Sequence, residues 1–317
     1  MQLTYPLIAR PADEGLSLED ALRKLPGVSS EKVWVSPCLP SAALSLEART
    51  LLMQRKVPAL FHCSTLVSDL EPDLWDGIFL DFQTSLSEAR KRVITFKERY
   101  SLPVWCFSSS GFSDSAPEAC VAVLQKVGAE VIGFSGDGLE TMLASCQTVC
   151  ETYLGVAPEN DADWTHLAQY GVGAAVSSVC SSLAPWEAYE HLFDANSELC
   201  RTTQMFHCAS VRSFFPLPYS LTLLPPVSIY SALRKVSEFR RNSGSIAQVI
   251  LKHSLDLDCF LKQQMQLDCP LCLTSRSSDL LEHAAAEYGG ILLLHPLGSL
   301  SEEGAERWIR RYGAVIV

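Results

Sequence analysis

The residues best suited to chemistry lie at the ends of short apolar runs in the first half of the chain. They include His62, Asp81, Asp137 and Glu159. One neutral imidazole and several carboxylates could hold a divalent metal ion or move protons to and from a substrate. Polar residues are also normal wherever strands meet water, and we favour solvated loop residues over a metal site. We therefore expect no metal and no other cofactor, and keep His62, Asp81 and Glu159 as the metal candidates.

A glycine-rich turn and its polar neighbours form a candidate site for a small acid. The turn reads Gly133-x-x-Gly136-x-Gly138, and exposed backbone amides at such a turn can hold a carboxylate or a phosphate. The order differs from the Gly-x-Gly-x-x-Gly fingerprint of dinucleotide-binding proteins, so a plain strand-to-helix turn is the favoured interpretation. The candidate small-acid residues are Ser108, Ser135, Gly136, Asp137 and Ser177.

The chain has 12 cysteines, and we expect most of them to be reduced thiols in the core. Cys63 follows His62 directly, but successive strand residues point to opposite faces, so the imidazole would not activate this thiol. Cys269 and Cys272 form a CxxC pair without a second Cys or His pair at zinc spacing. Buried structural thiols are therefore favoured there over a metal or redox site.

Composition limits the class of protein and of partner. The 317 residues are 48% hydrophobic and 19% charged, which is enough apolar content to bury a core. The net charge of −11 disfavours nucleic acid and anionic lipid as partners. No apolar run reaches the roughly 18 residues of a membrane span, and residues 1–6 lack the pattern of a secretory signal. We expect a cytoplasmic protein without nucleic-acid or membrane partners.

The candidate side chains lie at the ends of short runs rich in Val, Ile, Leu and Phe, which we expect to be β-strands. Eight of them recur every 20–30 residues, each followed by a polar break and a helical pattern, which is the rhythm of βα units. Eight units favour a (β/α)8 TIM barrel over residues 1–196, with an open doubly wound sheet as the alternative. The predicted strands are 6–9, 33–35, 57–62, 77–81, 103–107, 130–134, 152–156 and 172–179.

Ser-x-x-Glu boxes predict where helices begin. In such a box the Ser oxygen and the Glu carboxylate satisfy free amides of the first helical turn. The boxes are Ser85-x-x-Glu88, Ser115-x-x-Glu118 and Ser299-x-x-Glu302.

After Pro185 the pattern changes and predicts a C-terminal helical region over residues 197–317. Four prolines should interrupt this region with an extended excursion, because proline ends helices. They are Pro216, Pro218, Pro225 and Pro226. The predicted helices span 186–196, 199–212, 229–241, 246–266, 278–288 and 302–312.

Several motifs occur in an order shared with one enzyme family. One runs from Gly171 to Val179 and continues with Trp186-Glu187-Ala188-Tyr189, and another runs from Leu294 to Glu303. They resemble the last strand with its helix, and the opening of the final helix, of the dihydrodipicolinate synthase and N-acetylneuraminate lyase family of class I aldolases. The resemblance spans nearly the whole chain and implies a barrel that forms a homo-oligomer. Smaller counterparts are Leu44-Ser45-x-Glu47, Asp76-Gly77, Leu102-Pro103-Val104 and Ile132-Gly133.

The chemistry that this resemblance implies depends on a few positions. Family members join a Lys at the end of the sixth strand to a 2-oxo acid as a Schiff base, and a Tyr on the fifth strand shuttles the proton. Ser135 stands at the Lys position and Phe107 at the Tyr position. Pro37 and Cys38 replace the two Thr of the carboxylate-binding loop. The resemblance therefore implies a lyase fold without its catalytic residues.

Three hypotheses for the function remain. We favour a divergent member of that family, a pseudoenzyme that has lost Schiff-base chemistry and binds a small carboxylate or 2-oxo acid, or serves as a scaffold. The alternative is an active lyase or hydrolase that uses strand-end carboxylates, with or without a metal. The third is a purely structural protein whose barrel mouth is filled by Phe107, Phe112 and Phe134.

Overall fold

The computed structural model divides the chain into two compact units. The N-terminal unit comprises 1–83, 96–111 and 129–201, and the C-terminal unit comprises 84–95, 112–128 and 202–317. The predicted boundary between 196 and 197 lies outside the described residues. These residues are 7–9, 33–35, 46–54, 58–63, 70–82, 85–108, 114–157, 167, 170, 172–177, 206–217, 221–241 and 245–317.

The N-terminal unit contains an eight-stranded parallel sheet, in which all eight predicted strands are confirmed. Neighbours in the chain are neighbours in the sheet from β3 to β8, and β8 then pairs with β1, which pairs with β2. No pair joins β2 to β3 within the described residues. The sheet is at least a half-barrel, and it lacks the order reversal of a doubly wound sheet. The strands are Leu7–Ala9 (β1), Val33–Val35 (β2), Leu60–Cys63 (β3), Gly77–Phe82 (β4), Val104–Ser108 (β5), Val131–Ser135 (β6), Tyr153–Ala157 (β7) and Val172–Ser177 (β8).

Helices separate the strands of this sheet along the chain. They are Leu46–Gln54 (α2), Pro72–Leu74 (η3, one 3₁₀ turn), Leu86–Arg99 (α3), Pro117–Lys126 (α4) and Leu139–Cys146 (α5). The serine half of the first predicted box caps α3, because Ser85 Oγ accepts a hydrogen bond of 3.4 Å from the Glu88 amide. The Glu88 carboxylate accepts from the Arg92 guanidinium at 2.5 Å.

The second predicted box is wrong. Ala116, with an extended backbone, precedes α4 and offers no side-chain cap, and the Ser115 hydroxyl donates to the Val211 carbonyl at 2.6 Å instead. Pro117 is the physical reason, since proline suits the first helical position and forces the residue before it into an extended conformation.

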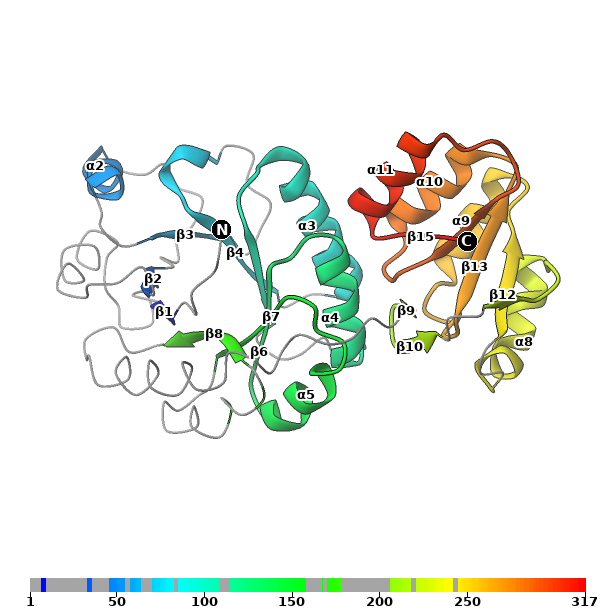
Figure 1. The fold of residues 1–317 in the computed structure, drawn as a ribbon, viewed down its shortest axis with the longest axis horizontal. Coiled ribbons are helices and arrows are strands. Elements are labelled where there is room, and N and C mark those ends of the chain that lie inside the picture. Colours follow the sequence, from blue (N-terminus) through cyan, green and yellow to red (C-terminus); the bar gives the residue numbers. More distant parts are fainter. Residues whose placement is uncertain are drawn as a thin grey trace. The chain divides into compact units, whose positions relative to one another are not determined.

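The C-terminal unit is a second parallel α/β arrangement. Strands β11 to β15 pair in chain order, and the helices α8 to α11 each contact the next, as expected when all crossovers lie on one face of a sheet (Figure 1). The antiparallel pair Phe206–Ala209 (β9) and Phe214–Leu217 (β10) precedes them. The other elements are Thr222–Leu223 (β11), Ile229–Arg241 (α8), Ser245–Ile250 (β12), Ser254–Lys262 (α9), Leu271–Ser275 (β13), Ser278–Glu287 (α10), Leu293–Pro296 (β14), Glu302–Tyr312 (α11) and Val315–Ile316 (β15).

The prediction of a C-terminal helical region over 197–317 is therefore wrong in part. Helices at 229–241, 278–288 and 302–312 are confirmed as α8, α10 and α11, whereas 199–212 contains β9 and 246–266 divides into β12 and α9. A continuously apolar stretch fits a fully buried parallel strand as well as a buried helix, so periodicity could not separate the two.

Smaller predictions for the same region also change. α11 is capped by Ser301, whose hydroxyl accepts from the Gly304 amide at 3.1 Å, two residues later than the predicted Ser299 box. Pro216 lies within β10, and Pro225 and Pro226 lie between β11 and α8. The predicted helix at 186–196 is outside the described residues. No helix in the described ranges is long and apolar enough to cross a bilayer.

Candidate functional site

The register of β3 to β6 places five large apolar side chains on one face of the N-terminal sheet, which we name the inner face. They pack together as one buried cluster: Leu60, Phe79, Trp105, Phe107 and Val131. Because strand residues alternate between faces, the residues two positions further along β3 and β4 share this face near its carboxyl end. These residues are His62 and Asp81.

His62 and Asp81 are brought together on the inner face. The imidazole Nε2 lies 4.0 Å from the Asp81 carboxylate Oδ2, and the two side chains are 7% and 16% exposed. The His62 ring also meets the Phe79 ring edge-on, with centroids 5.1 Å apart. A distance of 4.0 Å is an ion-pair distance rather than a hydrogen bond, and catalytic His contacts are often this loose before a ligand binds. An imidazole beside a largely buried carboxylate can act as an acid–base pair.

Phe107 occupies the centre of the inner face. Its ring stacks on Phe79 with centroids 5.0 Å apart and lies against Gly133 and Gly155 on the next two strands. A Cβ atom added at Gly133 would lie 2.1 Å from the Phe107 ring, and one at Gly155 would lie 2.5 Å from it. Both glycines are therefore required by the aromatic ring, because any side chain there would overlap it.

The predicted small-acid residues are only partly brought together. Ser135 donates its hydroxyl to the Ser108 carbonyl at 2.9 Å, so these two strand ends are adjacent. Ser108 follows Phe107, and its buried hydroxyl therefore points to the opposite face, where no described residue bonds it. Ser177 ends β8, and its side chain lies outside the described structure. Ser108 and Ser135 thus do not present two hydroxyls to one ligand.

The turn after β6 behaves as the favoured strand-to-helix turn. Gly136 and Gly138 have φ of 94° and 77°, in the left-handed region that glycine tolerates, and Gly138 precedes the first residue of α5. Asp137 between them is exposed. A carboxylate at the start of a helix interacts favourably with the free amides and would repel a second anion.

No lysine lies on any of the strands β1 to β8. Lys97 of α3 is engaged by the Glu130 carboxylate and by the Leu102 carbonyl, and Lys91 pairs with Glu287 at 2.6 Å. Phe134 lies on the face opposite Phe107. Within the described ranges no three His, Cys, Asp or Glu side chains gather as a metal site. The predicted site residues Pro37, Cys38, Phe112 and Glu159 lie outside those ranges.

The CxxC thiols are buried in the C-terminal unit. Cys269 is 1% exposed and Cys272 is fully buried. Burial, followed by the nearby Asp268 carboxylate, raises the pKa of the Cys269 thiol to about 12, and burial raises the pKa of Cys272 to about 12. Metals and electrophiles react with the thiolate, so both groups are inert near neutral pH. This agrees with the expectation of structural thiols.

Sequence reasoning missed a polar cluster on the C-terminal sheet. Gln248 Nε2 lies 2.8 Å from His295 Nδ1, and the Thr274 hydroxyl donates to the His295 carbonyl at 2.8 Å. Gln248 is 6% exposed and Thr274 is fully buried. The signal was a polar residue near the end of each of three successive apolar strands, which is visible only once the strands are recognised.

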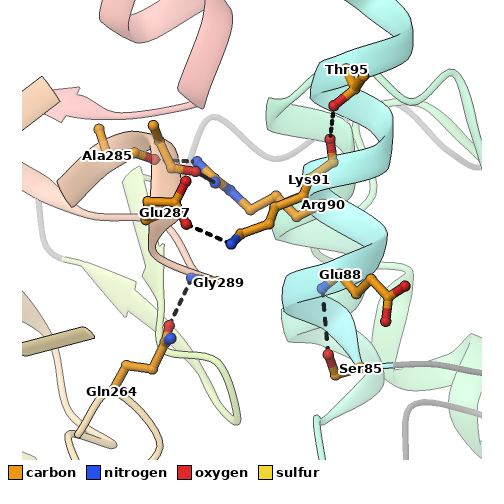
Figure 2. A network of polar contacts seen from close by, with 10 residues as sticks. Ser85, Glu88, Arg90, Lys91, Thr95, Gln264, Ala285, Glu287 and Gly289 are labelled. Atoms are coloured by element: carbon orange, nitrogen blue, oxygen red, sulfur yellow. Dashed lines mark hydrogen bonds and ion pairs between the residues drawn. The ribbon is translucent and has the colours of Figure 1, made fainter. Parts of the chain in front are cut away.

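Sequence reasoning also missed Arg90, which joins α3 to two helices of the C-terminal unit (Figure 2). Its guanidinium donates to the Ala285, Ala286 and Tyr312 carbonyls at 2.7, 3.0 and 2.6 Å, which are the last turns of α10 and α11. Burial lowers the pKa of Arg90 to about 10, so it is still charged at neutral pH. A cation at two helix C-termini donates hydrogen bonds to their free carbonyls and interacts favourably with both helix dipoles.

Comparisons with known proteins give no family for this chain. No family model matches it, and no curated protein matches it. Among solved structures it is similar to wild-type GGGPS from Thermoplasma volcanium, with a TM-score of 0.37 and 12% identity over 63% of this chain and 95% of that chain.

Proposed function

We propose that the N-terminal unit is a closed (β/α)8 barrel that performs acid–base chemistry on a small molecule, as a lyase or hydrolase, with His62 and Asp81 as its reactive pair. The observation that carries the proposal is the convergence of these two side chains at 4.0 Å on the inner face. The pair lies near the carboxyl ends of β3 and β4, where barrel enzymes hold their catalytic groups.

Roles for the two residues follow from their chemistry. His62 exchanges a proton with the substrate, and Asp81 orients the imidazole and balances the positive charge that develops on it. The carboxylate also opposes a ligand anion placed directly beside it, so a substrate carboxylate would lie away from Asp81. The proposal needs neither a metal nor a lysine.

Deuterium exchange tests the proposal without a known substrate. Pyruvate, other 2-oxo acids and 2-hydroxy acids, the ligand class that the family resemblance implies, are incubated with the protein in D2O and followed by NMR. We expect catalysed exchange, for at least one compound, of a proton alpha to a carbonyl group, on C3 of a 2-oxo acid or on the hydroxyl-bearing C2 of a 2-hydroxy acid. His62→Gln should lower the exchange rate by about 100-fold or more, the size of a general-base contribution.

Asp81→Asn should lower the same rate by a smaller factor, and His283→Gln, an exposed imidazole on α10, serves as the matched control. Exchange that persists unchanged in His62→Gln would overturn the proposal. So would the absence of exchange for every compound tested.

A second candidate function is supported by Phe107. Its ring fills the inner face over Gly133 and Gly155, as expected of a scaffold or a binder of small carboxylates that has lost catalysis. The relation to the dihydrodipicolinate synthase and N-acetylneuraminate lyase family, and the homo-oligomer that it implies, are part of this second proposal. Sedimentation velocity of the full chain tests the oligomer, because a monomer at all concentrations would contradict it.

A further inference from the structure

The C-terminal sheet has one face on which apolar and polar residues are sharply divided along the strands. Ile246, Cys272 and Leu293 pack against Cys208 and Leu217 of the β9–β10 pair. Two positions further along the same strands, the same face carries Gln248, Thr274 and His295. The β9–β10 pair therefore covers the amino-terminal part of this face, and the polar cluster lies near the carboxyl edge.

The polar cluster is held rigidly by its own contacts. Gln248 fixes one nitrogen of the His295 ring, Thr274 fixes the His295 backbone, and the Ser275 hydroxyl donates to the Leu251 carbonyl at 2.7 Å in the adjacent loop. The His295 side chain is partly exposed, and among the described residues its ring is bonded at Nδ1 and not at Nε2. Burying an amide and an imidazole costs free energy that an apolar pair would not, so the cluster is a poor choice for stability alone.

We propose that this carboxyl edge is a second ligand site, in which Gln248 and His295 bind the oxygen atoms of a small phosphate- or carboxylate-bearing molecule. Binding residues of α/β proteins lie disproportionately in loops held by a rigid scaffold, and the loops that follow β12, β13 and β14 begin at this edge. An imidazole whose Nδ1 is fixed by a neighbour presents Nε2 in one orientation, which favours a directed hydrogen bond. Lys252 and Arg276, both exposed, lie in the loops that follow β12 and β13 at this edge of the sheet.

Acidic residues at this edge weaken the long-range electrostatic attraction of an anionic ligand. Asp256 accepts hydrogen bonds from the Lys252 and His253 amides at 2.8 and 3.1 Å, and Asp279 and Glu302 lie in the first turns of α10 and α11. These carboxylates offset the two cations, so binding depends on directed hydrogen bonds rather than on long-range attraction. We expect weak binding with little dependence on ionic strength.

The test follows the His295 ring by NMR in the labelled full-length protein, with inorganic phosphate and acetate as separate probes. We expect a saturable shift of the His295 ring signals with at least one probe, and no such shift at the exposed His253 and His283. Gln248→Met keeps the side-chain volume and removes the hydrogen bond, and should weaken binding by about tenfold, a loss of about 1.4 kcal/mol. His283→Gln should leave it unchanged.

Two results would overturn the inference. One is a His295 shift that rises without saturation and equals those of His253 and His283, which indicates adventitious ion contact only. The other is unchanged saturable binding in a folded Gln248→Met protein. Because the site belongs to the C-terminal unit, His62→Gln should bind the probes normally, so failure here is separable from failure of the acid–base proposal.

Discussion

Both units contain a parallel sheet in which chain neighbours pair, but different kinds of side chain pack against the two sheets. In the N-terminal unit a single ring, Phe107, lies over two glycines, and His62 and Asp81 come together on the inner face. In the C-terminal unit a hairpin covers the sheet, thiols fill the space beneath it, and a buried arginine binds two helix ends. The first sheet is thus arranged around close aromatic packing beside one imidazole–carboxylate pair, and the second around buried polar groups.

Removing Arg90 should have the largest effect on stability. Arg90→Ala leaves two buried carbonyls and one partly buried carbonyl at the ends of α10 and α11 without their donor, so we expect a loss of about 4 kcal/mol in the free energy of unfolding. Denaturant titration measures the loss, and hydrogen exchange should locate it in α10 and α11. The matched control Arg307→Ala breaks the exposed pair with Glu282 and should cost less than about 1 kcal/mol. Equal losses would contradict the stabilising role given to the buried Arg90 contacts.

Alkaline pH should unfold the C-terminal unit first. The pKa values of Cys269 and Cys272 rise from about 9 in the unfolded chain to about 12, so the folded state binds more protons between these values. The stabilisation is fully present below pH 9 and is lost as pH rises to 12, by up to about 1.4 kcal/mol per pH unit for each thiol.

Other buried groups modify this pH dependence. Burial also raises the pKa values of Cys208 and Tyr288, which act in the same direction, whereas the lowered pKa of Arg90 acts in the opposite direction above about pH 10. Burial likewise raises the pKa of Cys106 on β5, so the N-terminal sheet is destabilised by one such thiol and the C-terminal unit by several groups. Hydrogen exchange at pH 7 and pH 10 should show earlier opening of β12 to β14 than of β4 to β6. Earlier opening of β4 to β6 at pH 10 would contradict this difference between the units.

Filling a glycine on the inner face should destabilise the N-terminal unit alone. Gly133→Ala places a methyl group 2.1 Å from the Phe107 ring, and we expect a loss of about 2 kcal/mol from overpacking. In a Phe107→Leu background the same change should cost less, because the smaller side chain can retreat. Thermal unfolding of both single variants and the double variant measures this coupling, and additive losses would contradict the packing described for Phe107.

The smallest predicted effect concerns the start of α3. Ser85→Ala removes the side-chain acceptor of the Glu88 amide and should lower stability by about 1 kcal/mol. Ser237→Ala, on the exposed face of α8, is the control and should change stability by less than about 0.5 kcal/mol. Chemical denaturation of both variants decides whether the Ser85 cap contributes.

The N-terminal sheet was predictable because each strand repeats the same local signal. An apolar run, a polar break and a helical pattern recur at all eight positions, and the structure confirms a strand at each. β12 was missed because Ile246, Ala247 and Val249 are all buried, and a strand buried on both faces has no alternation to detect.

The candidate sites were less predictable because their contacts join distant segments. His62 and Asp81 were identified as separate strand-end residues, and only the sheet register places them side by side. Arg90 reads as an ordinary helix residue, although it binds carbonyls 195 and 222 positions away. The Gln248–His295 bond likewise requires the order β12–β13–β14, which a helical prediction conceals.

Borohydride trapping tests the central claim most directly, which is that the N-terminal unit works without a lysine. The full-length protein is incubated with pyruvate and related 2-oxo acids, reduced, and analysed by intact mass and peptide mapping, with a known Schiff-base aldolase trapped in parallel. The account predicts no covalent adduct on any lysine, together with His62-dependent deuterium exchange. An adduct on a lysine would contradict it and restore Schiff-base chemistry.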